Sequence, residues 1–183
     1  MSEKNKKFRF KITVIGDGAV GKTSLIQKFT NGAFIEDYIK TIGAQFSIFD
    51  KKIDKDKIKL LFWDIAGQDD FYFLRPSFFK NSVAAIIVYS LEENKLGKES
   101  FKHIHNWAND IKEYCGDIPV VIFGNKVDLI DEKKLDTSAI EKIIEEENYL
   151  GYFTTSAKTG KRVIDAFNAI IDELYVKYKA IPV

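Results

Sequence analysis

The chain has 183 residues, a length that fits one domain with a substantial buried core. Its 28 lysines and arginines nearly balance its 27 aspartates and glutamates, so the net charge of +1 gives no reason to expect a nucleic-acid partner. A single cysteine excludes an intrachain disulfide, and without a signal-peptide core or an apolar run of about 20 residues the expected location is the cytoplasm.

Strand-like and helical stretches alternate along the chain after a polar, basic segment, residues 1–7, which we expect to be flexible. Apolar runs predict six strands, at residues 8–15, 44–50, 57–63, 83–89, 120–124 and 152–155. Apolar residues at helical spacing predict helices at residues 22–30, 101–111, 136–148 and 163–174. No internal repeat or second domain is visible.

The strands 44–50 and 57–63 have only a charged connection, residues 51–56, between them, which predicts an antiparallel hairpin. The other strands alternate with helices, an arrangement typical of parallel pairing. The predicted fold is therefore α/β, with a mostly parallel six-stranded sheet, one antiparallel edge strand and helices on both faces. We expect this single domain to cover residues 8–180.

The loop after the first strand has the pattern Gly-x-x-x-x-Gly-Lys-Thr, residues 16–23, and it opens a helix. Its backbone N–H groups can surround a phosphate, because glycines let the chain curl inward. The lysine can reach the β and γ phosphates, and the threonine hydroxyl suits Mg²⁺. The predicted phosphate-binding residues are Asp17, Gly18, Ala19, Val20, Gly21, Lys22, Thr23 and Ser24. The alternative is an ordinary glycine-rich turn.

A second polar group follows the strand 57–63. Asp64 carries a carboxylate that could hold Mg²⁺, often through water, and Gly67 can offer its N–H to a terminal phosphate. The side-chain amide of Gln68 could orient an attacking water molecule. Taken alone, an aspartate at a strand end is often a cap and a loop glutamine is usually solvated, so both interpretations stay open.

Two more loops follow predicted strands: Asn125-Lys126-Val127-Asp128 and Ser156-Ala157-Lys158. The Asp128 carboxylate can accept hydrogen bonds from the ring N–H and the amine of guanine, and this pairing could discriminate against adenine by a factor of about 10⁴. Asn125 can tie its loop to the phosphate loop, while the Lys126 stem can lie along the base. The Ala157 N–H can bind the guanine oxygen and Lys158 can cover the ring, although this tripeptide alone is typical of a helix-entry turn.

In order and spacing, these loops resemble the small GTPase superfamily over residues 10–179. The resemblance implies that Thr41 binds Mg²⁺ and the γ-phosphate and that Phe34 closes over the base edge. Without the resemblance, Thr41 would be interpreted as a turn residue and Phe34 as a loop anchor. The implied metal ligands are Thr23, Thr41 and Asp64, and the implied catalytic set is Gln68, Lys22 and Thr41. The implied switch loops are residues 33–43 and 65–81.

Within the superfamily the chain is most similar to the Rab group, in the stretch Thr41-Ile42-Gly43-Ala44-Gln45-Phe46, in Trp63, in Phe78 and in Glu99-Ser100-Phe101 ahead of Trp107. Phe46, Trp63 and Phe78 match an aromatic triad that displays the nucleotide state, with ordinary packing as the alternative. Asp69-Asp70 departs from the Rab pattern, and Pro76 is expected to interrupt a segment that is often helical. No terminal cysteine is present for prenylation, so membrane attachment is not encoded in this chain and would need a tail or a partner.

The resemblance implies a monomeric GTP-binding switch that takes GTP or GDP with Mg²⁺ and is served by effectors, exchange factors and GTPase-activating proteins. Lys40 stands where some GTPases keep an arginine, which favours slow hydrolysis accelerated by a partner's arginine. Arg75 is interpreted as solvated or partner-facing, with an internal role as the missing arginine as the alternative. His103 and His105 are interpreted as surface residues away from the site. A nucleotide-holding scaffold or pseudo-GTPase is one alternative; a P-loop kinase or metabolic NTPase is another, disfavoured by residues 125–128.

Overall fold

Six strands form one sheet in the computed structural model, which describes residues 5–34, 41–66, 73 and 75–181. The strands are β1 (Lys7–Ile15), β2 (Ala44–Ile53), β3 (Asp56–Ile65), β4 (Ala84–Ser90), β5 (Val120–Asn125) and β6 (Gly151–Thr154). Their order is β2-β3-β1-β4-β5-β6, with β2 antiparallel to β3 and every other neighbouring pair parallel. The predicted mixed sheet with one antiparallel edge strand is confirmed.

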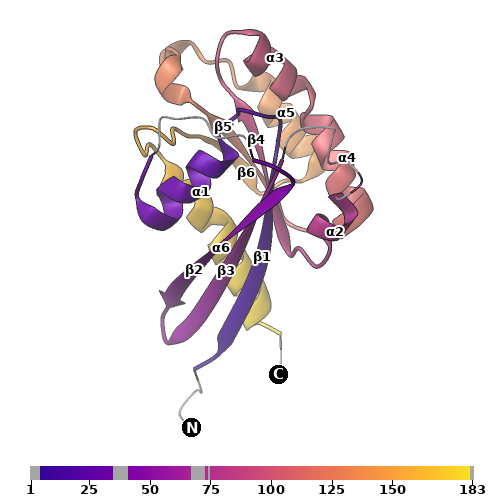
Figure 1. Ribbon diagram of the computed structural model, residues 1–183, viewed down its shortest axis with the longest axis vertical. Coiled ribbons are helices and arrows are strands. Elements are labelled where there is room, and N and C mark those ends of the chain that lie inside the picture. Colours follow the sequence, from indigo (N-terminus) through magenta and orange to yellow (C-terminus); the bar gives the residue numbers. More distant parts are fainter. Residues whose placement is uncertain (1–4, 35–40, 67–72, 74, 182–183) are drawn as a thin grey trace.

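Helices cover both faces of this sheet (Figure 1). They are α1 (Lys22–Asn31), α2 (Arg75–Phe79), α3 (Lys95–Lys102), α4 (Ile104–Cys115), α5 (Ser138–Glu147) and α6 (Val163–Lys179), with short 3₁₀ turns at Val127–Leu129 and Glu132–Lys134. Helices α1 and α6 pack on one face, while α2, α4 and α5 pack on the other. Among the described helices, none combines the length and the apolar character needed to cross a bilayer.

The two sides of the sheet bury separate apolar clusters. On the α1/α6 side, the rings of Phe29 and Phe167 stack with their centroids 4.5 Å apart, and Phe62 of β3 meets both edge-on. On the other side, Trp107 of α4 and Ile140 of α5 pack against β4 and β5. Because β4 and β5 are buried on both faces, they read as continuous apolar runs, as predicted.

The hairpin is longer than its sequence pattern predicted. Residues 51–53 continue β2 and Asp56 already begins β3, so the connection expected over residues 51–56 is wrong in extent. The charged side chains remain compatible with pairing, because alternate residues of a strand point to opposite faces. Lys51 lies against α6, where its Nζ donates to Asn168 Oδ1 (2.7 Å) and pairs with Asp172 (3.6 Å).

Two helical predictions are also corrected. The stretch predicted as one helix over residues 101–111 is divided into α3 and α4, which meet at His103. Pro76 does not interrupt a helix; it is the second residue of α2, in the first turn, where the missing N–H costs no intrahelical hydrogen bond.

Candidate functional site

The carboxyl ends of the parallel strands bring the predicted loops to one edge of the sheet. The phosphate loop follows β1, and two of its glycines, Gly16 and Gly21, leave no room for a side chain. A Cβ on Gly16 (φ +142°) would lie 2.0 Å from the Val88 carbonyl oxygen, and a Cβ on Gly21 (φ +99°) would lie 2.3 Å from Asn125 Nδ2. The loop therefore fits its neighbours only with glycine at these two positions.

Lys22 is buried at the centre of this loop. Its Nζ donates to the carbonyl oxygens of Gly16 (2.9 Å) and Asp17 (2.7 Å). Burial lowers the pKa of Lys22 to about 8, although the carboxylates of Asp64 and Asp17 oppose the shift. A phosphate group beside Nζ would stabilise the charged ammonium, so this lysine is suited to an anionic ligand.

Three oxygen atoms predicted to bind Mg²⁺ lie together. The Thr23 hydroxyl donates to Asp64 Oδ2 and lies 3.1 Å from the Thr41 hydroxyl, which in turn lies 3.5 Å from Asp64 Oδ2. The other oxygen, Asp64 Oδ1, is buried and has no hydrogen-bond partner in the described part of the chain. Burial raises the pKa of Asp64, while the charge of Lys22 opposes that change. A buried carboxylate beside two hydroxyls fits a hard cation such as Mg²⁺, which these three residues would hold.

Asn125 links three of the loops. Its side chain is 1% exposed, and Nδ2 donates to the Val20 carbonyl of the phosphate loop (2.9 Å). Its Oδ1 accepts from Thr155 Oγ1 (3.3 Å) and from the Ala157 N–H (3.2 Å). The Ala157 N–H predicted to bind the guanine oxygen thus donates to Asn125 here, and its contact with a base stays a prediction.

The other residues predicted to contact the guanine base lie near Asn125. Lys126 adopts a left-handed backbone (φ +68°), and its Nζ pairs with Glu92 at 2.6 Å. Asp128 is exposed in the 3₁₀ turn after β5, and the buried Ser156 hydroxyl accepts the N–H of Thr159 (3.0 Å). The other predicted base-side residues are Lys158, which is exposed, and Phe34, which is half-buried against the α1/α6 core.

Part of the predicted site falls outside the described residues. Gly67 and Gln68 are not described, nor is most of the loop ahead of Thr41. The roles given to Gly67 and Gln68, in phosphate binding and water positioning, therefore stay predictions. Of the described residues at the phosphate side, Ala19 is exposed, and Gly18 and Ser24 are half-buried.

The Ras family model matches residues 11–176 of this sequence. The chain belongs to the Ras family. It is 36% identical over 181 residues to Ras-related protein Rab-1 of Theileria annulata, covering 98% of this chain and 80% of the relative. It is also 35% identical to Rab-13 of Mesocricetus auratus, covering 92% of this chain and 81% of the relative. A third similar protein is Rab-5A of Dictyostelium discoideum, 33% identical over 95% of this chain and 85% of the relative. Ras-family proteins are GTPases, and the chain is accordingly a GTPase.

In this Ras-family chain, Trp107 connects the phosphate loop to α2. Its Nε1 donates to Asp17 Oδ1 (2.9 Å), and the Arg75 guanidinium lies over its ring, 4.4 Å from the centroid. Arg75 is buried and pairs with Asp110 at 2.8 Å, so its interpretation as a solvated or partner-facing residue is wrong. The sequence marks Trp107 as a core position at helical spacing and as part of the Rab resemblance, and neither indicates its contact with Asp17.

His103 also contacts the phosphate loop. Its Nδ1 lies 2.7 Å from Asp17 Oδ2, so the expectation that it lies away from the site is wrong, although the side chain remains 46% exposed. His105 is exposed on α4. Both oxygens of Asp17 are therefore held by residues 86 and 90 positions further along the chain, a link that spacing in the sequence does not indicate.

The predicted aromatic triad is assembled on the side of the sheet that carries α2. The ring centroids of Phe46 and Trp63 lie 6.0 Å apart, as do those of Trp63 and Phe78. Phe46 is 61% exposed, which is unusual for a phenylalanine in a strand, and Lys11 Nζ lies 4.2 Å from the centre of the Trp63 ring. An exposed aromatic group beside the site is typical of a protein-binding surface.

Replacing Trp107 with phenylalanine tests the link to Asp17. The variant keeps an aromatic ring beside Arg75 but loses the Nε1 donor, so we expect GDP to dissociate about three- to tenfold faster and stability to fall by about 1 kcal/mol. Stopped-flow release of a fluorescent GDP analogue measures the first effect. His105→Ala, at an exposed position on the same helix, is the control, and equal release rates in the two variants would contradict the link.

Proposed function

We propose that this protein is a GTP-binding switch of the Rab type, with GTP or GDP and Mg²⁺ bound at the loops of residues 16–23, 125–128 and 156–158. The observation that carries the proposal is the position of Thr41. This residue belongs to the first predicted switch loop, residues 33–43, and its hydroxyl lies 3.1 Å from the Thr23 hydroxyl and 3.5 Å from Asp64 Oδ2. A γ-phosphate and Mg²⁺ held there would also hold the loop, and hydrolysis would release it.

The chain's own residues supply most of what hydrolysis needs. The buried Lys22 ammonium would neutralise charge that develops on the phosphates, and Gln68 would orient the attacking water. Bound Mg²⁺ would supply a second positive charge at the phosphates. Lys40, and not an arginine, directly precedes Thr41, so we expect slow intrinsic turnover and an acceleration of about 10³ to 10⁵ when a partner supplies an arginine.

The nucleotide state would be displayed to protein partners on the triad Phe46, Trp63 and Phe78. The strands that carry Phe46 and Trp63 join the two switch segments, because β2 begins just after Thr41 and β3 ends just before Gly67. Effectors, exchange factors and GTPase-activating proteins would bind here. The proposed setting is vesicle trafficking, in the cytoplasm or on membranes reached through a tail or a partner, with the protein itself monomeric.

Single-turnover hydrolysis tests the switch against the scaffold alternative. We expect the wild-type protein to release phosphate from GTP over minutes to hours and Gln68→Leu to release it at least about tenfold more slowly. GTP should outcompete ATP by a factor of about 10⁴ because of Asp128. If the wild type binds GTP without releasing phosphate, the scaffold alternative is favoured. Equal rates of phosphate release by the wild type and Gln68→Leu would show that Gln68 does not orient the water. Equal affinities for ATP and GTP would contradict guanine recognition by Asp128.

A further inference from the structure

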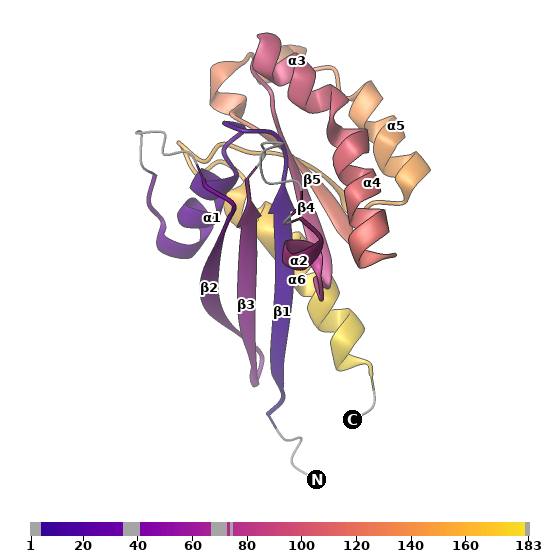
Figure 2. The same ribbon diagram turned by 45° about the vertical axis from the view of Figure 1, so that its right-hand side comes forward.

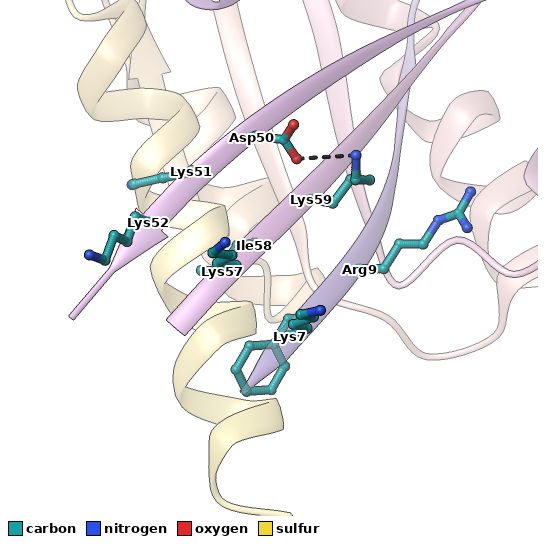
Figure 3. Close-up of a pocket in the computed structure, with 9 residues that line it drawn as sticks. Lys7, Arg9, Asp50, Lys51, Lys52, Lys57, Ile58 and Lys59 are labelled. Atoms are coloured by element: carbon teal, nitrogen blue, oxygen red, sulfur yellow. Dashed lines mark ion pairs between the residues drawn. The ribbon is translucent and has the colours of Figure 1, made fainter. Parts of the chain in front are cut away.

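A group of positive side chains lies on one open face of the sheet, at the end opposite the phosphate loop. Lys7 and Arg9 of β1, Lys57 and Lys59 of β3, and Lys52 of β2 line a trough of about 660 Å³ (Figure 3). We call these five residues the basic trough. Helix α6 lies behind the strands in Figure 3. None of the described helices covers the lower part of β1, β2 and β3 on the opposite face (Figure 2).

The strand register brings these charges into two rows. Lys7, Lys57 and Lys52 are direct neighbours across the three strands, and Arg9 and Lys59 form the next row with Asp50. Adjacent strands are about 4.8 Å apart, and residues two apart on a strand are about 7 Å apart. The five cations therefore occupy an area of roughly 10 by 7 Å.

Among the described residues that line the trough, one carboxylate, that of Asp50, balances these charges. Asp50 pairs with Lys59 at 3.3 Å. Within the described ranges, Lys7, Arg9, Lys52 and Lys57 have no ion-pair partner, and all four are exposed. The whole chain has a net charge of only +1, so this excess is local.

Such a cluster is unfavourable for the fold itself, because like charges placed directly opposite each other destabilise a sheet. Lysines often protect an edge strand from pairing with other chains, and this accounts for Lys52. It does not account for the other four, because β1 and β3 are interior strands with a partner on each side. An unfavourable local interaction that brings no structural benefit, such as this charge repulsion, is typical of a functional site.

We propose that the basic trough binds a multiply phosphorylated anion, such as an inositol phosphate, free or as a lipid headgroup. Each phosphate carries about two negative charges and three acceptor oxygens. A compact ligand with several phosphates can thus meet all five cations. In an extended acidic peptide, the carboxylates that point to the same side are about 7 Å apart, so the peptide would bring about two negative charges to the area of the trough. The trough therefore favours the phosphorylated ligand.

The test uses the protein saturated with GDP and Mg²⁺. Inositol hexakisphosphate is titrated by calorimetry at about 0.1 M salt, and Lys57→Glu is compared with Lys98→Glu, an exposed position on α3 with the same charge change. We expect Lys57→Glu to weaken binding at least about tenfold and Lys98→Glu to change it less than about twofold. Without ligand, Lys57→Glu should melt higher than wild type at low salt, because it relieves repulsion from Lys7 and Lys52.

Vesicles distinguish the two sources of the ligand. Co-sedimentation with phosphatidylcholine vesicles containing roughly 5% phosphatidylinositol bisphosphate indicates a lipid headgroup, and binding of the free inositol phosphate alone indicates a soluble ligand. Either result supports the proposal. Equal binding to phosphatidylserine vesicles of matched charge would overturn it, as would equal affinity for a glutamate decapeptide, unchanged binding by Lys57→Glu, or displacement of GDP by the inositol phosphate.

Discussion

Asn125→Ala should weaken GDP binding at least about a hundredfold and lower the free energy of unfolding by about 2 to 4 kcal/mol. The variant leaves the Val20 carbonyl, the Thr155 hydroxyl and the Ala157 N–H without the partner that each has now. Each buried polar group that loses its partner costs about 1 to 3 kcal/mol unless water reaches it. The loss also detaches the guanine-side loops from the phosphate loop, so the nucleotide would have to order them on binding.

Equilibrium binding of a fluorescent GDP analogue and chemical denaturation measure the two effects of Asn125→Ala. Asn109→Ala is the matched control, because Asn109 is an exposed asparagine on α4. We expect the control to change stability by less than about 0.5 kcal/mol. If Asn125→Ala loses stability but keeps its affinity for GDP, Asn125 supports the fold without organising the nucleotide site, and its proposed role is wrong.

Local sequence patterns were sufficient to predict most of the fold. The buried strands β4 and β5 read as unbroken apolar runs because both of their faces are covered, and Gly32 ends α1 in the left-handed conformation expected of a helix-terminating glycine. The extent of the hairpin was not predictable in this way. Lys51 and Lys52 belong to a strand only because one packs against α6 and the other faces solvent, and this depends on distant residues.

The motifs also predicted which loops lie together, since the carboxyl ends of parallel strands share one edge. Contacts between one motif and an unremarkable helix could not be predicted. Asp17 is held by His103 and Trp107, and Arg75 is buried against Asp110, through packing of α2 and α4 that leaves no periodic signal. The basic trough was likewise invisible, because Lys7, Lys52 and Lys57 become neighbours only through strand register.

Lys22→Met should lower the affinity for GTP by about a thousandfold, because it removes a buried charge that no other described residue can bring to the same position.

The titration of Lys22 predicts a more specific result in the wild type. Its pKa is about 8 without nucleotide, and burial is the main cause. Neighbouring phosphates would raise that pKa, and protonated Lys22 is the form that binds. Affinity should therefore be constant below pH 8 and fall up to about tenfold per pH unit above it.

Without nucleotide, the free energy of unfolding should change with pH in the direction opposite to the affinity for GTP. The ordinary pKa of 10.5 describes the unfolded chain, so between about pH 8 and 10.5 the unfolded state binds more protons than the folded state. The free energy of unfolding should rise with pH across this range while GTP affinity falls. Lys22→Arg is the control, because a guanidinium keeps its charge throughout and removes both Lys22-dependent slopes, leaving only those of other groups. Identical pH profiles for wild type and Lys22→Arg would show that Lys22 stays charged without nucleotide, and the coupling between its burial and phosphate binding would be wrong.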